Sequence, residues 1–309
     1  MIRVGILDFD SGHSVVCARH LNHSDQLPEK DWVDGARVVA GCSQAPSFWG
    51  PEALRNNIKA CEALGVEIVA TPQDMLGKVD AVMVLSDDGR YHLERARPFL
   101  EAGVPTYVDK PLSFSPVEAA EIIHLAKAHG TPLLAVDALR YLPAIRDIVD
   151  NPDSCGQVVG AMAFCGAIDQ YGNSGLLYYG MHAFEILVAL MGPELKWVSS
   201  TICESAHLVT LEWADGRLGT VRAQTAPKYW YGFTAWCEKD VRSWLMSKNP
   251  DEFNRMYAAF LKAVVGFFAT GVAPVSPEET AFVLDLCRAA LLSESRNGER
   301  VGVFRRQPS

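Results

Sequence analysis

The stretch VPTYVDKP, residues 104–111, decides the fold of the first half of the chain. Its first five residues form an apolar run of strand length, and the proline at 111 stops the strand because it cannot donate a ladder hydrogen bond. In open α/β sheets, ligands bind in the crevice at the carboxyl ends of the strands. Lys110 is therefore a candidate catalytic ammonium, and a strand-ending turn that carries a solvated lysine is the alternative.

The segments around this stretch repeat the same alternation of strand and helix. Further apolar runs of strand length are Ile2–Leu7, Arg37–Cys42, Val66–Ala70, Asp80–Leu85 and Pro132–Val136. Amphipathic segments of helix length lie at 13–22, 51–64, 90–102 and 116–129. Strands that alternate with helices are typical of a parallel sheet. The sequence predicts a doubly wound, Rossmann-like α/β domain over residues 1–137.

The second half has a different rhythm. A helix is predicted at 175–191, strand-like runs follow at 197–203, 208–213, 218–224 and 229–237, and two helices are predicted at 251–269 and 277–293. Asp215-Gly216 is a two-residue hairpin signal between two of these runs. Consecutive hairpins favour an antiparallel sheet. We expect residues 138–309 to form an α+β domain with a largely antiparallel open sheet, which binds substrate and forms oligomers.

Composition narrows the class of partner. The chain has 309 residues and a net charge of −9, with 49% apolar and 21% charged residues. Nucleic acid and anionic membrane surfaces both favour basic patches, so a small molecule or another subunit is the expected partner. The N-terminus has no long apolar segment, and the eight cysteines include no Cys-x-x-Cys pair. A cytoplasmic location with free thiols is expected.

Five segments of the chain have an order and spacing that point to one family. They are Asp80-Ala81-Val82 through His92, Asp109-Lys110-Pro111, Arg140-Tyr141-Leu142-Pro143, Gly175 to His182, and Pro274 to Ser293. Together they resemble the Gfo/Idh/MocA family of NAD(P)-dependent oxidoreductases, which act on sugars, cyclitols and related polyols. The resemblance covers nearly the whole chain.

The resemblance implies hydride transfer between a sugar-like alcohol carbon and a nicotinamide, with Lys110, His182 and Tyr178 as catalytic residues. Tyr178 stands where the family has an aspartate, four residues before His182, a spacing that keeps both on one side of an α-helix. The implied cofactor-binding residues are Asp10, Ser11, Gly12, His13, Ser43, Ser86, His92, Asp109 and Pro111. The implied substrate-binding residues are Arg140, Lys110, Tyr178, His182 and Trp230. A homodimer or homotetramer is also implied.

The turn after the first strand departs from the family pattern. It reads Asp8-Phe9-Asp10-Ser11-Gly12-His13, with acids where the first two glycines of G-x-G-x-x-G belong. A carboxylate about 5 Å from a phosphate costs on the order of 3 kcal/mol at an effective dielectric near 20. The acids therefore predict weakened dinucleotide binding. Alternatively, Asp10 or Ser11 caps the helix that follows.

The sequence leaves the choice of cofactor and the reaction type open. Residues 40–44 after the second strand lack both the acid that would hold an NAD ribose and the arginine that would accept a 2′-phosphate, so NAD and NADP are both candidates. A redox-neutral, NAD-assisted lyase or glycosidase and a non-catalytic accessory protein are alternative functions. His13, Cys17, His20 and His23 raise the question of a metal site, but we predict none. The aromatic run 229–231 could stack on a sugar or simply cover the sheet.

Overall fold

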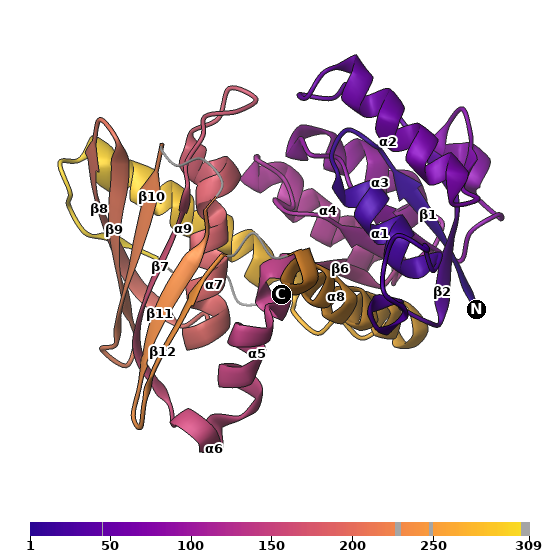
Figure 1. The fold of residues 1–309 in the computed structure, drawn as a ribbon. Coiled ribbons are helices and arrows are strands. Elements are labelled where there is room, and N and C mark those ends of the chain that lie inside the picture. Colours follow the sequence, from indigo (N-terminus) through magenta and orange to yellow (C-terminus); the bar gives the residue numbers. More distant parts are fainter. Residues whose placement is uncertain (45, 226–229, 247–249, 304–309) are drawn as a thin grey trace. The chain divides into compact units, whose positions relative to one another are not determined.

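Figure 1 shows a computed structural model of the chain, in which residues 1–44, 46–225, 230–246 and 250–303 are described. The chain forms two compact units. The first contains Met1–Ala138 and Phe253–Thr280, and the second contains Leu139–Glu252 and the residues from Ala281 onward. The sequence did not predict that residues 253–280 return to the first unit.

The first unit contains a six-stranded parallel sheet in the order β3-β2-β1-β4-β5-β6. The strands are β1 (Ile2–Leu7), β2 (Ala36–Cys42), β3 (Glu67–Ile68), β4 (Ala81–Val84), β5 (Thr106–Val108) and β6 (Leu133–Ala135). The predicted Rossmann-like parallel sheet is confirmed. The order reverses between β1 and β4, and open α/β sheets bind their ligands at such a switch point.

Helices cover this sheet. They are α1 (His13–Leu21), α2 (Pro51–Ala63), α3 (His92–Glu101), α4 (Pro116–His129) and most of α8 (Pro250–Thr270). Right-handed crossovers put α1 and α2 on one face and α3 and α4 on the other, since the strand order runs in opposite directions from β1.

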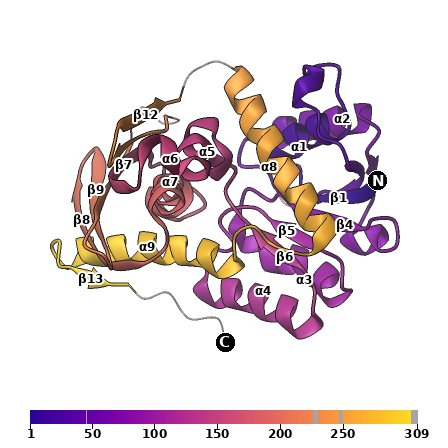
Figure 2. The same ribbon diagram turned by 90° about the horizontal axis from the view of Figure 1, so that it is seen from below.

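Helix α8 joins the first unit from far along the chain (Figure 2). The ring of Tyr257 lies beside the rings of His13 and His20, and the ring of Phe260 lies 5.4 Å from that of Tyr107 in β5. These contacts are between residues distant in sequence, so helix periodicity alone could not reveal them. Although α8 is the longest helix, none in the part of the chain described here is both long and apolar enough to cross a membrane.

The second unit has a seven-stranded mixed sheet in the order β12-β11-β7-β10-β9-β8-β13. Its strands are β7 (Val158–Gly166), β8 (Leu195–Cys203), β9 (Ala206–Trp213), β10 (Leu218–Gln224), β11 (Gly232–Cys237), β12 (Val241–Leu245) and β13 (Val301–Gly302). Only β7 and β10 pair in parallel among the pairs of this sheet that the described residues form. The sequence missed β7, whose glycines and alanines have low strand propensity.

The helices of the second unit are α5 (Pro143–Asp150), α6 (Pro152–Cys155), α7 (Met181–Met191) and α9 (Pro277–Ser295), and a π-helical turn at Leu176–Gly180 leads into α7. A Cβ on Gly219 of β10 would lie 2.7 Å from the ring of Trp213 in β9 and 3.3 Å from Leu187 in α7. These close contacts explain a glycine in the middle of a strand.

The β9–β10 hairpin corrects one prediction. Gly216 has φ +89°, its N–H donates to the carbonyl of Trp213, and the N–H of Trp213 donates to the carbonyl of Arg217. The loop therefore has three residues, 214–216, and the two-residue turn predicted from Asp215-Gly216 is wrong. Glycine suits the third position because a left-handed residue is required there.

Candidate functional site

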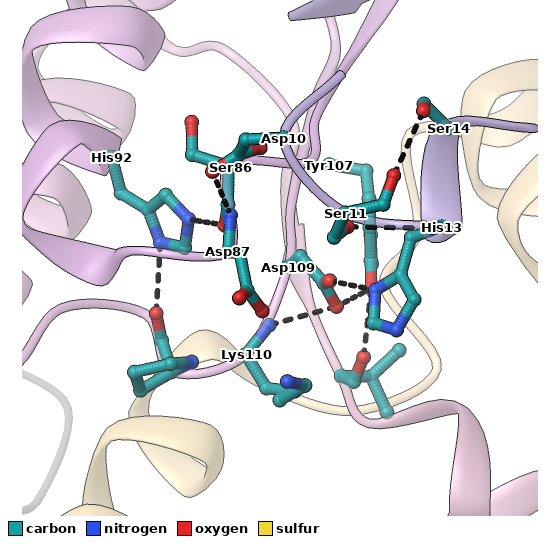
Figure 3. A network of polar contacts seen from close by, with 12 residues as sticks. Asp10, Ser11, His13, Ser14, Ser86, Asp87, His92, Tyr107, Asp109 and Lys110 are labelled. Atoms are coloured by element: carbon teal, nitrogen blue, oxygen red, sulfur yellow. Dashed lines mark hydrogen bonds and ion pairs between the residues drawn. The ribbon is translucent and has the colours of Figure 1, made fainter. Parts of the chain in front are cut away.

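The carboxyl ends of β1, β4 and β5 lie next to one another and are followed by three segments rich in polar residues (Figure 3). The turn 8–12 follows β1, residues 85–91 follow β4, and residues 109–115 follow β5. Polar side chains from these segments and from neighbouring elements form the network drawn in Figure 3. This is the ligand-binding edge of a doubly wound sheet.

Asp8 is held inside this edge. It has φ +67°, a left-handed conformation that explains why glycine usually stands here. Its Oδ1 accepts a hydrogen bond from the N–H of Gln44 at 2.8 Å, and its Oδ2 accepts from Ser86 Oγ at 2.6 Å and Arg95 Nε at 3.1 Å. Asp8 and Arg95 are both buried. The charge of this carboxylate is therefore compensated within the protein, and Ser86 positions Asp8.

Asp10 is part of the turn, and it is fully buried. Its Oδ2 accepts a hydrogen bond from the N–H of Asp87 at 2.9 Å, and its carbonyl accepts from Ser47 Oγ at 2.7 Å. Burial, followed by the negative charge of Asp8, raises the pKa of Asp10 to about 8. At neutral pH, Asp10 is therefore mostly an uncharged carboxylic acid. The expectation that two charged acids oppose the pyrophosphate is corrected for this reason.

The structure also decides between the two residues expected to cap the first helix. Gly12 occupies the N-cap position, and the side chain of Ser11 accepts a hydrogen bond from the N–H of His13 at 3.3 Å. Asp10 does not cap the helix, because its carboxyl group is directed toward Asp87. The cap hypothesis is wrong for Asp10 and holds for Ser11 only as this single contact.

The backbone of the turn is fixed and open to a ligand. Asn57 Nδ2 donates to the carbonyls of Phe9 and Ser11 at 2.9 and 3.0 Å. Gly12 is exposed, and a Cβ at this position would have no atom within 4 Å. A helix N-terminus with open backbone is a favourable environment for phosphate. With Asp8 paired and Asp10 buried, the turn fits a dinucleotide.

His13 stands in place of the third glycine and forms an ion pair that the sequence did not predict. Its Nδ1 lies 2.5 Å from Oδ2 of Asp109, while Oδ1 of Asp109 accepts hydrogen bonds from Tyr107 at 3.0 Å and from the N–H of Lys110 at 2.9 Å. Burial opposes the charge on both partners, but their mutual attraction prevails. The pKa of Asp109 lies below its usual value, and the pKa of His13 lies above its own.

His92 links two of the three segments. Its Nδ1 lies 2.8 Å from the carbonyl of Pro111, and its Nε2 lies 2.8 Å from the carbonyl of Ser86. The ring is fully buried. The structure therefore places His92 where it positions the segment around Lys110, whose peptide bond to Pro111 is cis.

The side-chain oxygen of Ser43, after β2, is also shielded from solvent.

In the second unit, Arg140 forms a buried ion pair. Its Nε donates to Oε2 of Glu185 in α7 at 2.6 Å. Arg140 was expected as a substrate ligand, whereas Glu185 was not predicted from the sequence. The lone carboxylate in the largely apolar segment MHAFEILVALM was the available signal, since a buried acid requires a cationic or hydrogen-bonding partner.

Tyr178 and His182 lie on either side of a change in helix geometry. Tyr178 is in the π-helical turn and His182 is in α7, so the α-helical spacing that put them on one side does not apply. The hydroxyl of Tyr178 accepts a hydrogen bond from Gln170 Nε2 at 3.0 Å, and the ring of His182 lies 5.3 Å from that of Tyr231. Both side chains are buried. Gln170 was not predicted.

The remaining predicted residues have less defined surroundings. Trp230 is partly exposed, and Tyr229, which belongs to the same aromatic run, lies outside the described residues. His20 Nδ1 lies 2.7 Å from the carbonyl of Asp31, and the ring of His23 stacks on Trp32. Among the residues that the structure describes, no group of three or more His, Cys, Asp and Glu side chains could hold a metal ion.

Comparison with known proteins relates part of the chain to one family. Residues 46–137 match the GFO_IDH_MocA model, described as an oxidoreductase family with an NAD-binding Rossmann fold. No curated protein matches the sequence.

Solved structures match the fold over nearly the whole chain. The myo-inositol dehydrogenase of Corynebacterium glutamicum is 16% identical with a TM-score of 0.79, covering 100% of both chains. The scyllo-inositol dehydrogenase of Lactobacillus casei, with bound NAD(H) and scyllo-inositol, is 15% identical with a TM-score of 0.77, covering 98% of this chain and 99% of that one. The L. casei myo-inositol dehydrogenase in complex with NAD(H) and myo-inositol is 16% identical with a TM-score of 0.78, covering 100% and 98%.

The parallel sheet with its switch point and the open turn at Gly12 agree with the NAD-binding Rossmann fold by which the family model is described, and the matched residues, 46–137, include the lysine after β5. Residues 46–137 are therefore similar to the NAD-binding Rossmann domain of the Gfo/Idh/MocA oxidoreductase family.

Proposed function

We propose that the protein is an NAD(P)-dependent oxidoreductase that transfers hydride to or from a CH–OH carbon of a cyclitol, sugar or related polyol. The observation that carries the proposal is Lys110, which follows β5 at the ligand-binding edge of an NAD-binding Rossmann domain. The inositol dehydrogenases with the same fold support a polyol as the substrate class. A bound nicotinamide would supply the hydride acceptor or donor.

Lys110 would handle the proton of the reacting hydroxyl. Its side chain is buried, and its backbone N–H donates a hydrogen bond to Asp109. The carboxylate of Asp109 is itself held by Tyr107 and His13. A general acid or base requires this kind of positioning before its pKa matters. Asp109 and Pro111 therefore serve as positioning residues for Lys110 in this proposal.

In the second unit, Tyr178 and His182 would provide further acid–base and hydrogen-bonding groups. Gln170 donates to the Tyr178 oxygen, and a donated hydrogen bond stabilises the phenolate more than the phenol. This contact supports Tyr178 in place of the family's carboxylate. Arg140, fixed by Glu185, and Trp230 stay proposed substrate ligands.

The proposal is tested by incubating the protein with NAD or NADP and a panel of inositol isomers and sugars while following nicotinamide absorbance. Oxidation of at least one polyol with cofactor reduction is the expected result. Product formation without a net absorbance change would instead indicate the redox-neutral lyase or glycosidase.

We also propose that the protein acts in the cytoplasm, as its scattered cysteines suggest.

Replacing Tyr178 with phenylalanine is expected to lower kcat/KM at least about tenfold, because the proton-carrying hydroxyl is lost and Gln170 loses its acceptor. Tyr178→Asp should be more active than Tyr178→Phe, since it restores a carboxylate. Tyr171→Phe is the control, because Tyr171 packs edge-on against Tyr178 at 5.6 Å and should keep that ring contact. Unchanged steady-state kinetics in Tyr178→Phe would assign the position to packing.

A second copy of the chain is the proposed macromolecular partner. One face of the mixed sheet exposes large apolar side chains from five of its strands, namely Met162, Leu208, Leu218, Trp236, Val241 and Leu245. They form connected rows: Trp236 pairs with Val241 and with Gly160, and Gly160 pairs with Leu218. An exposed apolar face of this kind marks an interaction site, and a two-fold dimer lets the same face pair with itself.

Trp236→Glu is therefore expected to convert a dimer or tetramer into smaller species, because it places a charge in the centre of an apolar contact. Light scattering coupled to size-exclusion chromatography measures the change. Val117→Glu, at an exposed position of α4, is the matched control and should leave the mass unchanged. An unchanged mass for Trp236→Glu would exclude this face as the interface.

A further inference from the structure

The turn after β1 contains more acids than a dinucleotide site should tolerate, and the structure treats them differently. Asp8 is paired with Arg95 at 3.1 Å, whereas Asp10 has no cationic partner within the part of the chain that the structure describes. Among those residues, Oδ2 of Asp10 has a hydrogen-bond partner, whereas Oδ1 is shielded from solvent and has none. A buried carboxylate with an unpaired oxygen is costly in the charged form.

We propose that the dinucleotide site is proton-linked: Asp10 is neutral when the cofactor binds, and its ionisation weakens binding of the pyrophosphate at the turn. The inference rests on the proposed cofactor use and adds its pH regulation. It explains how an acid can occupy the second glycine position of the turn without destroying the site. Geometry favours the neutral form, since Asp10 is fully buried and its Oδ1 has no hydrogen-bond partner among the described residues.

The charged and titratable groups around Asp10 support this linkage. Asp8 and Asp87 add negative charge from the turn and from the segment after β4, and both favour the protonated form of Asp10. Arg95 in α3 compensates Asp8 through a direct contact. Figure 3 also shows His13 in α1 and the pair Asp109 and Lys110 after β5, with His13 bound to Asp109. His92 contacts backbone carbonyls, Cys42 of β2 is a protonated thiol whose pKa is raised to about 11, and Asn57 of α2 is uncharged.

The sign of the effect follows from the direction of the shift. The pKa of Asp10 is about 8 in the folded protein, so the carboxyl is neutral below this pH and negative above it. The pyrophosphate keeps its two negative charges over this range, so repulsion appears only on the alkaline side. Affinity should be nearly constant at lower pH and fall above pH 8 by at most about tenfold per pH unit, the limit for one linked proton.

The test is calorimetric titration of the full chain with NADH and NADPH between pH 6.5 and pH 9.5. For the wild type, we expect the Kd to increase about ten- to thirtyfold from pH 7 to pH 9.5. For Asp10→Asn, which is isosteric and can still accept from the N–H of Asp87, this increase should be lost. Any contribution of His13 is present in both proteins, so the difference between their profiles isolates Asp10. Asp80→Asn removes one half-exposed charge just before β4 and should retain the wild-type profile.

Two measurements keep the test independent of the variant and of activity. In buffers of different ionisation enthalpy at pH 8.5, the wild type should take up a fraction of a proton on binding. Without cofactor, the urea midpoint of Asp10→Asn should rise relative to that of the wild type between pH 5 and pH 8. The reason is that a raised carboxyl pKa makes the native wild type lose stability as the pH rises toward that pKa.

The outcomes separate two failures. Binding with the same pH profile in the wild type and Asp10→Asn, and no proton uptake, would overturn the proton linkage but not the cofactor assignment. No binding of NADH or NADPH at any pH would overturn both. A Kd that falls as pH rises would contradict the sign of the linkage.

Discussion

Replacing Lys110 with alanine is expected to lower kcat at least ~100-fold, because the ammonium is the proposed acid–base group and such groups typically contribute this much. The side chain is buried at the carboxyl end of β5 next to Asp109, so water cannot replace the ammonium group as acid or base unless the site rearranges. Steady-state assay with the polyol that gives turnover measures the loss. NADH binding and the urea unfolding midpoint should change little, which separates a chemical role from a structural one.

Lys78→Ala is the matched control for this experiment. Lys78 precedes β4, is half-exposed and pairs with Glu67 at 2.5 Å on the surface, so its removal should leave turnover within about twofold of the wild type. If Lys110→Ala kept more than about a tenth of the wild-type kcat, the proton would have to pass through another group, and the proposed role of Lys110 would be wrong.

Breaking the Asp8–Arg95 pair should give the largest loss of stability among the site variants. Arg95→Met removes the guanidinium beside the fully buried Asp8 carboxylate and leaves it the neutral donors Ser86 and the N–H of Gln44. Removing one partner of a buried ion pair typically costs about 3–5 kcal/mol in the free energy of unfolding. Urea denaturation at pH 7 measures this loss.

A double-mutant cycle identifies the cause of the loss. Asp8→Asn is the suitable partner change because asparagine tolerates the left-handed conformation that Asp8 adopts, with φ +67°. The double variant Asp8→Asn/Arg95→Met should lose less than the sum of the two single variants, by about 0.5–3 kcal/mol. Arg97→Met, on the exposed side of α3, is the control and should cost below about 1 kcal/mol. Strict additivity would show that Arg95 does not compensate Asp8.

Pairing of Asp8 also bears on the hypothesis of a non-catalytic accessory protein. That hypothesis was motivated by the broken glycine-rich turn and by the missing acid after the second strand. The structure pairs one acid of the turn with Arg95 and keeps the other largely neutral at pH 7, so the first of these two motives no longer holds. In the function proposed here, Asp8 and Asp10 are parts of a dinucleotide site in which side chains stand where the family pattern has glycine.

Several features could be predicted from the sequence because they depend on near neighbours along the chain. Strand and helix alternation predicted the parallel sheet, since each apolar run and its following helix are encoded within about 30 residues. The edge position of Lys110 followed in the same way from the strand that precedes it. The left-handed turn residue in the β9–β10 hairpin was indicated by Gly216, although the loop length was not.

Contacts between distant residues decided the rest. Asp8 meets Arg95 across 87 positions, and Asp10 meets the N–H of Asp87 across 77. The pairing of His13 with Asp109, of Arg140 with Glu185 and of Gln170 with Tyr178 likewise has no periodic signal. The sequence by itself determined the fold class and the edge of the sheet on which the lysine lies. Only the tertiary structure decided which acids carry charge, because burial and the distance to other charges set a carboxyl pKa, and neither is a property of the local sequence.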